Sequence, residues 1–443
     1  MSPVTSSAQL RPDGARMLRL LDRLAEATGD DEGAQRVAWT DRWRAARDIL
    51  RSELDGLPVE VTTDASANIW ARLAGAREET VLIGSHLDSV PGGGRLDGAY
   101  GVMCALEVLR TLAGGPQLPC TLTLVDWADE EGARFGRSLF GSAAVAGNLD
   151  VEAVRNLTDA AGERLEVVLG RWGVELDALD ASQAGFGPVA AYLEAHIEQG
   201  PVLEHLGVPI AAVTGTAGVE RHRVTFSGET AHSGTTPMEL RHDAFVAGAT
   251  LALAVRDAAV RHGGVGTVGV ARLRPGIPTA VPGEAALVVD LRHQRREPLA
   301  AMLEAAREAA RGAADTTGCH VGWEPVFCIE PRPFNDRIVA IVQRVCSELT
   351  GREAVTVPSG ALHDATEVAT VVPTGMVFTS STRGISHSTR EDTPPEHLKL
   401  GLEAYDRVVR EVIELVGATG KAAFADGSPG GSGTGPDGGA RRG

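Results

Sequence analysis

Aromatic side chains, cysteines and long apolar runs are all scarce in this chain of 443 residues. Aromatic residues make up 4% and glycines number 53, a composition that favours alanine-rich helices and glycine-rich loops over an aromatic-cored β-sandwich. Because no run of 18 apolar residues occurs, neither a spanning helix nor a membrane partner is expected. The five cysteines form no CxxC pair, which disfavours a structural zinc site and favours free thiols in a cytoplasmic protein.

Basic residues are also in the minority. Lys and Arg number 42 against 59 Asp and Glu, so the formal net charge is −17. A duplex-binding surface usually carries a basic excess, so nucleic acid is not an expected partner. The start of the chain lacks a basic segment followed by an apolar one, and no signal peptide is expected. The length suits two domains, and 43% apolar residues exclude wholesale disorder.

Strand-like and helix-like segments alternate along most of the chain, which predicts an α/β fold with a mixed, mostly parallel sheet flanked by helices. Between about 216 and 329 the order changes to β-α-β-β-α-β, the pattern of an α+β split-βαβ module. We therefore expect one domain built from 1–215 and 330–417, an inserted domain at 216–329, and a disordered tail at 418–443. The polar stretch 150–185 shows no clear period and is expected to be irregular.

The first group of chemically suggestive residues follows an apolar strand at 80–85. His86 and Asp88 are two residues apart, so their side chains share one face of the strand. A metal-binding histidine needs its second ring nitrogen held, and Asp88 is placed to hold it. Asp97 follows in a glycine-rich loop before a helix. These residues together favour a metal site over a packed histidine.

A run of three carboxylates, Asp129, Glu130 and Glu131, follows the next strand. Such a cluster is costly to bury unless a cation compensates it, whereas a solvated acidic turn is the alternative reading. Neighbouring glutamates point in different directions, so one could bind a metal while the other handles a proton.

Four further histidines lie in loops that follow strands or are rich in small residues: His196, His232, His363 and His387. Each alone would more often be a packed side chain. Together, His86, His196 and His387 with Asp97 and Glu131 supply nitrogen and oxygen ligands for two divalent cations, such as Zn, Mn, Co or Ni. A carboxylate bridging two ions about 3.5–4 Å apart is the arrangement that activates a water.

Five motifs carry a family resemblance: GSHLDSVPGGGRLDG, DEEGARFG, LEAHIEQGP, AHSGTTPM and SHSTRE. Over about 35–415 the chain resembles the hydantoinase/carbamoylase branch of the aminoacylase-like dinuclear metallohydrolases. That branch includes N-carbamoyl-L-amino acid hydrolases, metal-dependent β-ureidopropionases and allantoate amidohydrolases. The motifs occur in the family's order and spacing.

The resemblance implies a role for each matching position. One metal would be held by His86 and His196, the other by Glu131 and His387, with Asp97 bridging both and Glu130 as general base. Substrate contacts would come from Gln199, Arg292 and His363. His232 would reach the partner subunit's site, which implies a homodimer built through the inserted dimerisation or lid domain.

The implied reaction is hydrolysis of the carbamoyl C–N bond of a small ureido acid, an N-carbamoyl-L-amino acid, to the amino acid, CO₂ and ammonia. Allantoate amidohydrolase or β-ureidopropionase activity is the alternative. Dipeptidase or aminoacylase activity ranks lower, because the peptidase relatives tend to carry an acid where this chain has His196. A catalytically inactive binding protein would lack a ligand or the base, and neither is missing from the sequence.

Overall fold

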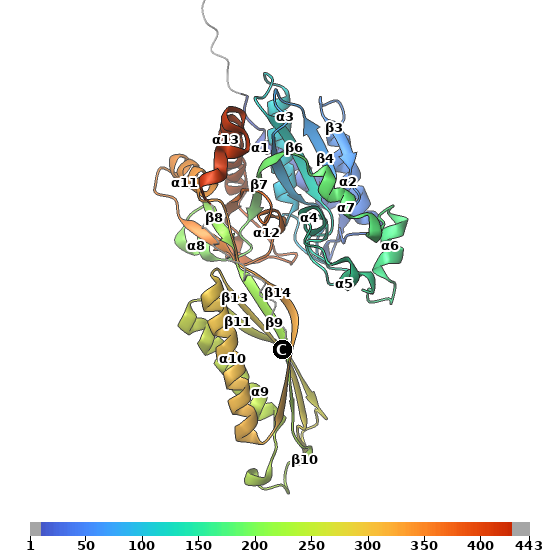
Figure 1. Cartoon of the computed structure of the whole chain (residues 1–443), viewed down its shortest axis with the longest axis vertical. Coiled ribbons are helices and arrows are strands. Elements are labelled where there is room, and N and C mark those ends of the chain that lie inside the picture. The colour runs from blue at the N-terminus through green and yellow to red at the C-terminus, as the bar shows by residue number, and fades with distance from the viewer. Residues whose placement is uncertain (1–9, 428–443) are drawn as a thin grey trace, which may run out of the picture.

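The computed structural model describes residues 10–427, which form two units, one above the other in Figure 1. The first unit holds a nine-stranded sheet and the second a four-stranded sheet. The chain leaves the first unit after β8 (Ile210–Thr216) and re-enters it at β15 (Arg332–Pro333), which pairs antiparallel with the end of β8.

The large sheet has the strand order β15-β8-β17-β7-β5-β6-β4-β3, and β16 also pairs with β8. Its remaining strands are β3 (Glu60–Thr63), β4 (Ile69–Leu73), β5 (Thr80–His86), β6 (Thr121–Trp127), β7 (Val189–Ile197), β16 (Thr356–Ser359) and β17 (Thr374–Thr379). The central strands β17, β7, β5 and β6 run parallel, whereas β3, β4 and β8 join antiparallel. The predicted fold class, a mixed sheet with a mostly parallel centre, is confirmed.

Helices cover both faces of this sheet, so its central strands are buried on both sides. Within β5, Val81 and Ile83 belong to one hydrophobic core and Leu82 to another, as the two-residue period of a strand requires. The first core includes α1 (Gly14–Thr28), α2 (Asp41–Leu54), α3 (Ala99–Ala113), α11 (Asp336–Thr350) and α13 (Pro395–Thr419). The second includes α4 (Phe140–Ala146), α8 (Val202–Leu206) and α12 (Asp364–Val368).

The segment 150–185, which we predicted to be irregular, is instead mostly helical. It contains α5 (Val151–Arg155), α6 (Leu165–Arg171), η1 (Leu176–Ala178) and α7 (Asp180–Gly185). Leu165 and Leu169 pack into a cluster with Trp39 and Trp43. Helices of five to seven residues complete at most two turns, too few for a hydrophobic period to be visible in the sequence.

The smaller unit consists of β9 (Gly218–Ser227), α9 (Ala244–His262), β11 (Val265–Arg274), β13 (Glu284–His293), α10 (Arg296–Thr317) and β14 (His320–Ile329). Its sheet has the antiparallel order β11-β13-β9-β14, and α9 and α10 pack together over one face. At its far end β10 (Ala231–His232) pairs with β12 (Ala280–Val281) (Figure 1). The elements follow the predicted β-α-β-β-α-β order, and the dimerisation or lid role of this unit stays a prediction.

The predicted disordered tail begins too early. Residues 418–427 belong to the end of α13 and to η4 (Gly420–Gly427), and Phe424 is buried in the first core. The rest of the predicted tail, 428–443, lies outside the described residues. The remaining short elements are β1 (Gly29–Asp30), β2 (Gly33–Ala34), η2 (Met238–Leu240) and η3 (Thr382–Gly384). Across residues 10–427, no helix combines the length and apolar character that crossing a membrane demands.

Candidate metal centre

The candidate ligands cluster because they lie at or just beyond the carboxyl ends of neighbouring strands. His86 ends β5, His196 is the penultimate residue of β7, and Glu131 lies in the loop after β6. Parallel strands bring such ends to one edge of the sheet, where open α/β sheets form their sites. The loop after β17 brings His387 to the same edge, where it lines one cavity with the other three.

Asp97 is the residue that the ligand groups share. Its Oδ1 lies 3.3 Å from His196 Nε2 and 3.8 Å from His86 Nε2. Its Oδ2 lies 3.2 Å from His387 Nε2, which is 3.5 Å from Glu131 Oε2. Two sets of three donor atoms therefore converge, His86–Asp97–His196 and Asp97–Glu131–His387, each with all atoms within 4.8 Å of one another. The structure thus brings together all five predicted ligands.

Glu130 lies beside the first set and belongs to neither. It is 6% exposed, and its Oε2 is 3.7 Å from His86 Nε2. Glu130 lines a cavity of about 390 Å³ together with the five candidate ligands. Its position leaves it available for proton transfer inside that cavity.

Asp88 acts differently from our expectation. His86 Nδ1 lies 3.1 Å from the backbone carbonyl oxygen of Asp88, whereas the carboxylate Oδ1 is 3.6 Å away. The carboxylate oxygens instead accept the backbone N–H groups of Glu130 and Glu131, each at 3.1 Å. Asp88 therefore orients the histidine through its main chain and the acidic loop through its side chain.

Backbone conformation also adapts to the site. Gly98 has a φ of +61°, and a Cβ there would lie 2.3 Å from the His86 ring, so only glycine fits. Gln199 and His387 have left-handed backbones, with φ of 58° and 53°. Non-glycine residues held in this region often mark functional sites.

Burial and neighbouring charges shift the pKa values of the acids and of His387 in this cluster. Burial, followed by repulsion from Asp97, raises the pKa of Glu131 to about 7. Burial also raises the pKa of Glu130 well above its ordinary value, although His86 opposes this. The hydrogen bond to Asp97 raises the pKa of His387 to about 9.

The types of donor atom in the cluster also suit divalent cations. Glu131 Oε1 is buried and has no hydrogen-bond partner within residues 10–427. Three imidazoles and two carboxylates suit zinc and its first-row neighbours, and dications would compensate the buried carboxylates. The residues present therefore fit a pair of divalent cations.

The three predicted substrate contacts line the same cavity. Gln199 Nε2 donates to Asp97 Oδ2 at 2.7 Å, and the amide oxygen has no partner in the described chain. Arg292 donates from Nε to Asp290 Oδ1 and from an Nη to the Gly360 carbonyl, both at 2.8 Å.

His363 is 1% exposed, and its Nε2 lies 2.9 Å from Ser359 Oγ. Burial, then the neighbouring His196, lowers the pKa of His363 well below its ordinary value, so it is neutral. Its ring offers the cavity an uncharged surface.

His232 is the one predicted site residue that the chain does not bring to the cluster. It lies in β10, at the end of the smaller unit farthest from the large sheet (Figure 1). Its Nδ1 accepts the backbone N–H groups of Gly234 and Thr235 at 3.0 and 3.2 Å. The neutral ring therefore carries its proton on Nε2.

Our sequence reasoning missed two supporting residues. Glu391 Oε1 accepts the backbone N–H groups of Leu96 and Asp97 at 2.9 and 3.1 Å, which fixes the Asp97 loop. Glu391 closes the SHSTRE motif, so the signal was present but only its histidine was singled out. Arg36 is fully buried, donates to the Leu87 carbonyl and is attracted electrostatically by the carboxylates of Glu391 and Asp88. It lies outside all five sequence motifs, so no signal in the sequence pointed to it.

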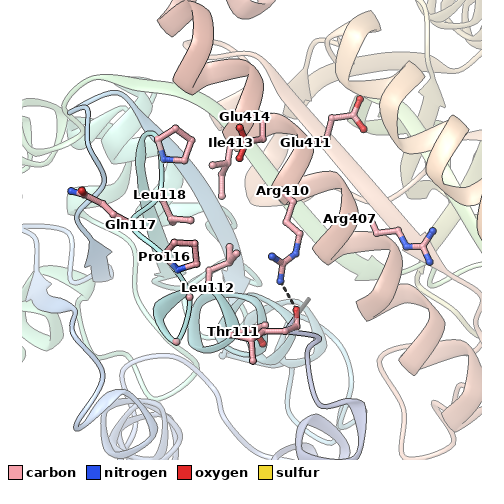
Figure 2. A pocket seen from close by; sticks show the side chains of 14 residues that line it. Thr111, Leu112, Pro116, Gln117, Leu118, Arg407, Arg410, Glu411, Ile413 and Glu414 are labelled. Atoms are coloured by element: carbon pink, nitrogen blue, oxygen red, sulfur yellow. Dashed lines mark hydrogen bonds between the residues drawn. The ribbon is translucent and has the colours of Figure 1, made fainter. Parts of the chain in front are cut away.

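A larger cavity, of about 760 Å³, lies between the end of α3 and α13 (Figure 2). Leu112, Pro116 and Ile413 line it, and the Arg410 guanidinium donates to the Leu10 carbonyl at 2.9 Å. Its lining includes no histidine or cysteine, so it lacks the chemistry of the metal cluster.

The chain is similar to a known family of hydrolases over most of its length. The sequence model of peptidase family M20/M25/M40 matches residues 82–411. The N-carbamoyl-L-amino acid amidohydrolase of Geobacillus stearothermophilus is 34% identical over 406 residues, covering 90% of this chain and 99% of the relative. The allantoate amidohydrolase of Escherichia coli (strain K12) is 32% identical over 378 residues, covering 84% and 91%. The crystal structure of a hydantoinase/carbamoylase family amidase from Burkholderia multivorans is similar with a TM-score of 0.82 at 33% identity, covering 90% and 98%.

Proposed function

The chain belongs to peptidase family M20/M25/M40, and on this premise we propose that it hydrolyses the carbamoyl C–N bond of N-carbamoyl-L-amino acids. The products are the free amino acid, CO₂ and ammonia. The observation that carries this proposal is the pair of donor sets sharing Asp97, with Glu130 beside them in one cavity. Allantoate is the second candidate substrate, since relatives of similar identity are named allantoate amidohydrolases.

Two divalent cations per subunit, drawn from Zn, Mn, Co and Ni, complete the proposed site. His86 and His196 would hold one cation, Glu131 and His387 would hold the other, and Asp97 would contribute to both. When bound, such a pair lowers the pKa of a water and polarises the scissile carbonyl. The buried carboxylates support this assignment, as does Glu131 Oε1, which has no hydrogen-bond partner in the described part of the chain.

Glu130 is the proposed general base and acid. Its carboxylate takes a proton from the attacking water and returns it to the leaving nitrogen. A catalytic carboxyl works best with a pKa near the operating pH, and the raised pKa of Glu130 is consistent with that requirement.

Arg292 is the proposed partner of the substrate carboxylate. Asp290 and the Gly360 carbonyl hold its guanidinium in place, and 30% of the side chain stays exposed. The planar fork of an arginine suits bidentate binding of a carboxylate. Gln199 and the neutral His363 border the remaining substrate space.

A homodimer through the smaller unit would place His232 at the partner subunit's cavity, where its Nε2–H stabilises negative charge on the substrate oxygen. The outer surface of α9 supports such an interface, because Val246, Leu253 and Val260 repeat every seven residues and are 49, 66 and 71% exposed. The neighbouring β11 is an edge strand. An apolar helix stripe beside an open sheet edge favours pairing between two copies.

The direct test is ammonia release by metal-reconstituted protein from N-carbamoyl-L- and N-carbamoyl-D-amino acids, N-carbamoyl-β-alanine and allantoate. We expect the N-carbamoyl-L-amino acids to be the best substrates. Preference for allantoate selects the second candidate, and preference for N-carbamoyl-β-alanine selects a β-ureidopropionase. No ammonia from any of these compounds refutes the proposal.

A further inference from the structure

A second group of metal-ligand side chains lies in the smaller unit, outside the cavity described above. Glu220 Oε2 is 2.7 Å from His222 Nε2 and 3.1 Å from Cys328 Sγ. Glu220 and His222 belong to β9, and Cys328 belongs to the neighbouring β14. The three donor atoms lie within 4.8 Å of one another.

A β-bulge in β14 brings the thiol to this place. Pro325 pairs with His222 and Cys328 pairs with Glu220, so the strand holds one residue more than its partner over this interval. With regular pairing, Phe327 would face Glu220 and the thiol would point to the other side of the sheet. Bulges re-aim side chains in this way and recur near functional sites.

We propose that Glu220, His222 and Cys328 bind one divalent cation of the zinc class, separate from the catalytic pair. Sulfur, imidazole nitrogen and carboxylate oxygen are all zinc donors, and one thiolate with one carboxylate balances the charge of a dication. Cys328 is exposed and the Glu220 side chain is 25% exposed, so solvent has access for cation entry and for a fourth, water ligand.

Proton movements accompany binding. The thiol proton leaves to solvent, and the imidazole proton moves from Nε2 to Nδ1. His222 Nδ1 is buried without a partner among residues 10–427, so the ring has one unsatisfied nitrogen both before and after the change.

The cation would connect two strands that also form a wall of the catalytic cavity. Side chains alternate along a strand, so Arg221 points away from Glu220 and His222, and Phe327 points away from Cys328. Arg221 and Phe327 line the catalytic cavity on that opposite face. The bound ion thus holds β9 to β14 directly behind this wall.

Cobalt reports this site because no cysteine belongs to the proposed catalytic ligands. Titration of the metal-free full-length protein with Co²⁺ should produce a near-ultraviolet thiolate-to-cobalt charge-transfer band and a third bound equivalent. Cys328→Ser should lose both, whereas Cys319→Ser, which changes a buried cysteine of the same unit, should keep both. Absence of the band in the wild-type protein, or its persistence in Cys328→Ser, overturns the proposal.

A thiol-reactivity assay gives an independent measurement. The other four cysteines are buried, so a disulfide reagent applied to the folded protein should titrate Cys328 alone. We expect Zn²⁺ to slow this reaction at least tenfold, and Glu220→Gln to weaken that protection while the fold is retained by circular dichroism. An unchanged rate with Zn²⁺ refutes the site. Neither assay depends on turnover, so both hold whatever the substrate panel shows.

Discussion

Glu130→Gln is the sharpest test of the proposed chemistry, because it removes a proton acceptor while nearly preserving the side chain's size. Glu130 is 6% exposed and contributes to neither donor set, so the variant should still bind two cations. A general base is worth about 10²–10⁴-fold in rate. At about 1.4 kcal/mol per tenfold, the activation free energy should rise by about 3–6 kcal/mol.

The same substitution should not destabilise the metal-free protein. Burial raises the pKa of Glu130 well above its ordinary value, so the folded state disfavours the ionised carboxylate. That unfavourable contribution grows as pH rises from the unfolded pKa of about 4.3 toward the folded one. Gln cannot ionise, so at pH 8 the thermal midpoint of the metal-free variant should equal or exceed that of the wild type.

Three measurements on one preparation decide the matter: ammonia release, metal content and thermal unfolding. Asp129→Asn is a matched control, because Asp129 is the adjacent buried carboxyl, accepts from Trp39 Nε1 and does not line the cavity. Turnover by Glu130→Gln within tenfold of the wild type would refute the base assignment. Loss of metal from this variant would show that Glu130 is a ligand instead.

Further predictions concern the cations, the substrate carboxylate and the subunit interface. Dialysis against a chelator should abolish ammonia release, with recovery on adding Mn, Zn, Co or Ni. Because burial and Asp97 raise the pKa of Glu131 to about 7, protons should compete with the cations and metal affinity should fall below that pH; equal affinity at pH 6 and 8 contradicts this. Arg292→Lys should raise KM about tenfold or more while changing kcat less, because a lysine lacks the bidentate fork, and an unaltered KM removes Arg292 from the carboxylate site. Inactive His232→Ala and Glu130→Gln subunits should recover activity when mixed, since one type of mixed site has both residues intact; verified mixed dimers without activity contradict a role across the interface.

The sequence predicts the elements of this site well because its ligands follow strands with unmistakable apolar character. His86 and the carboxylates after β6 could be placed at one sheet edge from the α/β rhythm alone, and the family resemblance, now confirmed, added the roles. The central parallel strands are correctly predicted for the same reason: strands buried on both faces read as continuous apolar runs.

What escaped prediction depends on contacts between segments distant in the chain. Glu391 accepts from the backbone N–H of Asp97, which lies 294 residues earlier in the sequence. Arg36 comes close to the carboxylates of Glu391 and Asp88 only in the folded chain. The thiol of Cys328 meets Glu220 because of one extra residue in β14, which no cysteine spacing reveals. The absence of a CxxC pair therefore argued against a metal site with a cysteine ligand, whereas the folded chain brings Cys328 together with Glu220 and His222.

The pairing of β8 with β15 makes the smaller unit an insertion between two neighbouring antiparallel strands. Thr216 and Arg332 are cross-strand neighbours, so everything between them is topologically the loop of one β-hairpin. The entropic cost of closing a loop grows only with the logarithm of its length, so such an expansion adds little penalty to the parent sheet. A tight turn in its place would leave the nine-stranded layer unbroken, and the chain passes between the two units at two adjacent positions, after β8 and before β15.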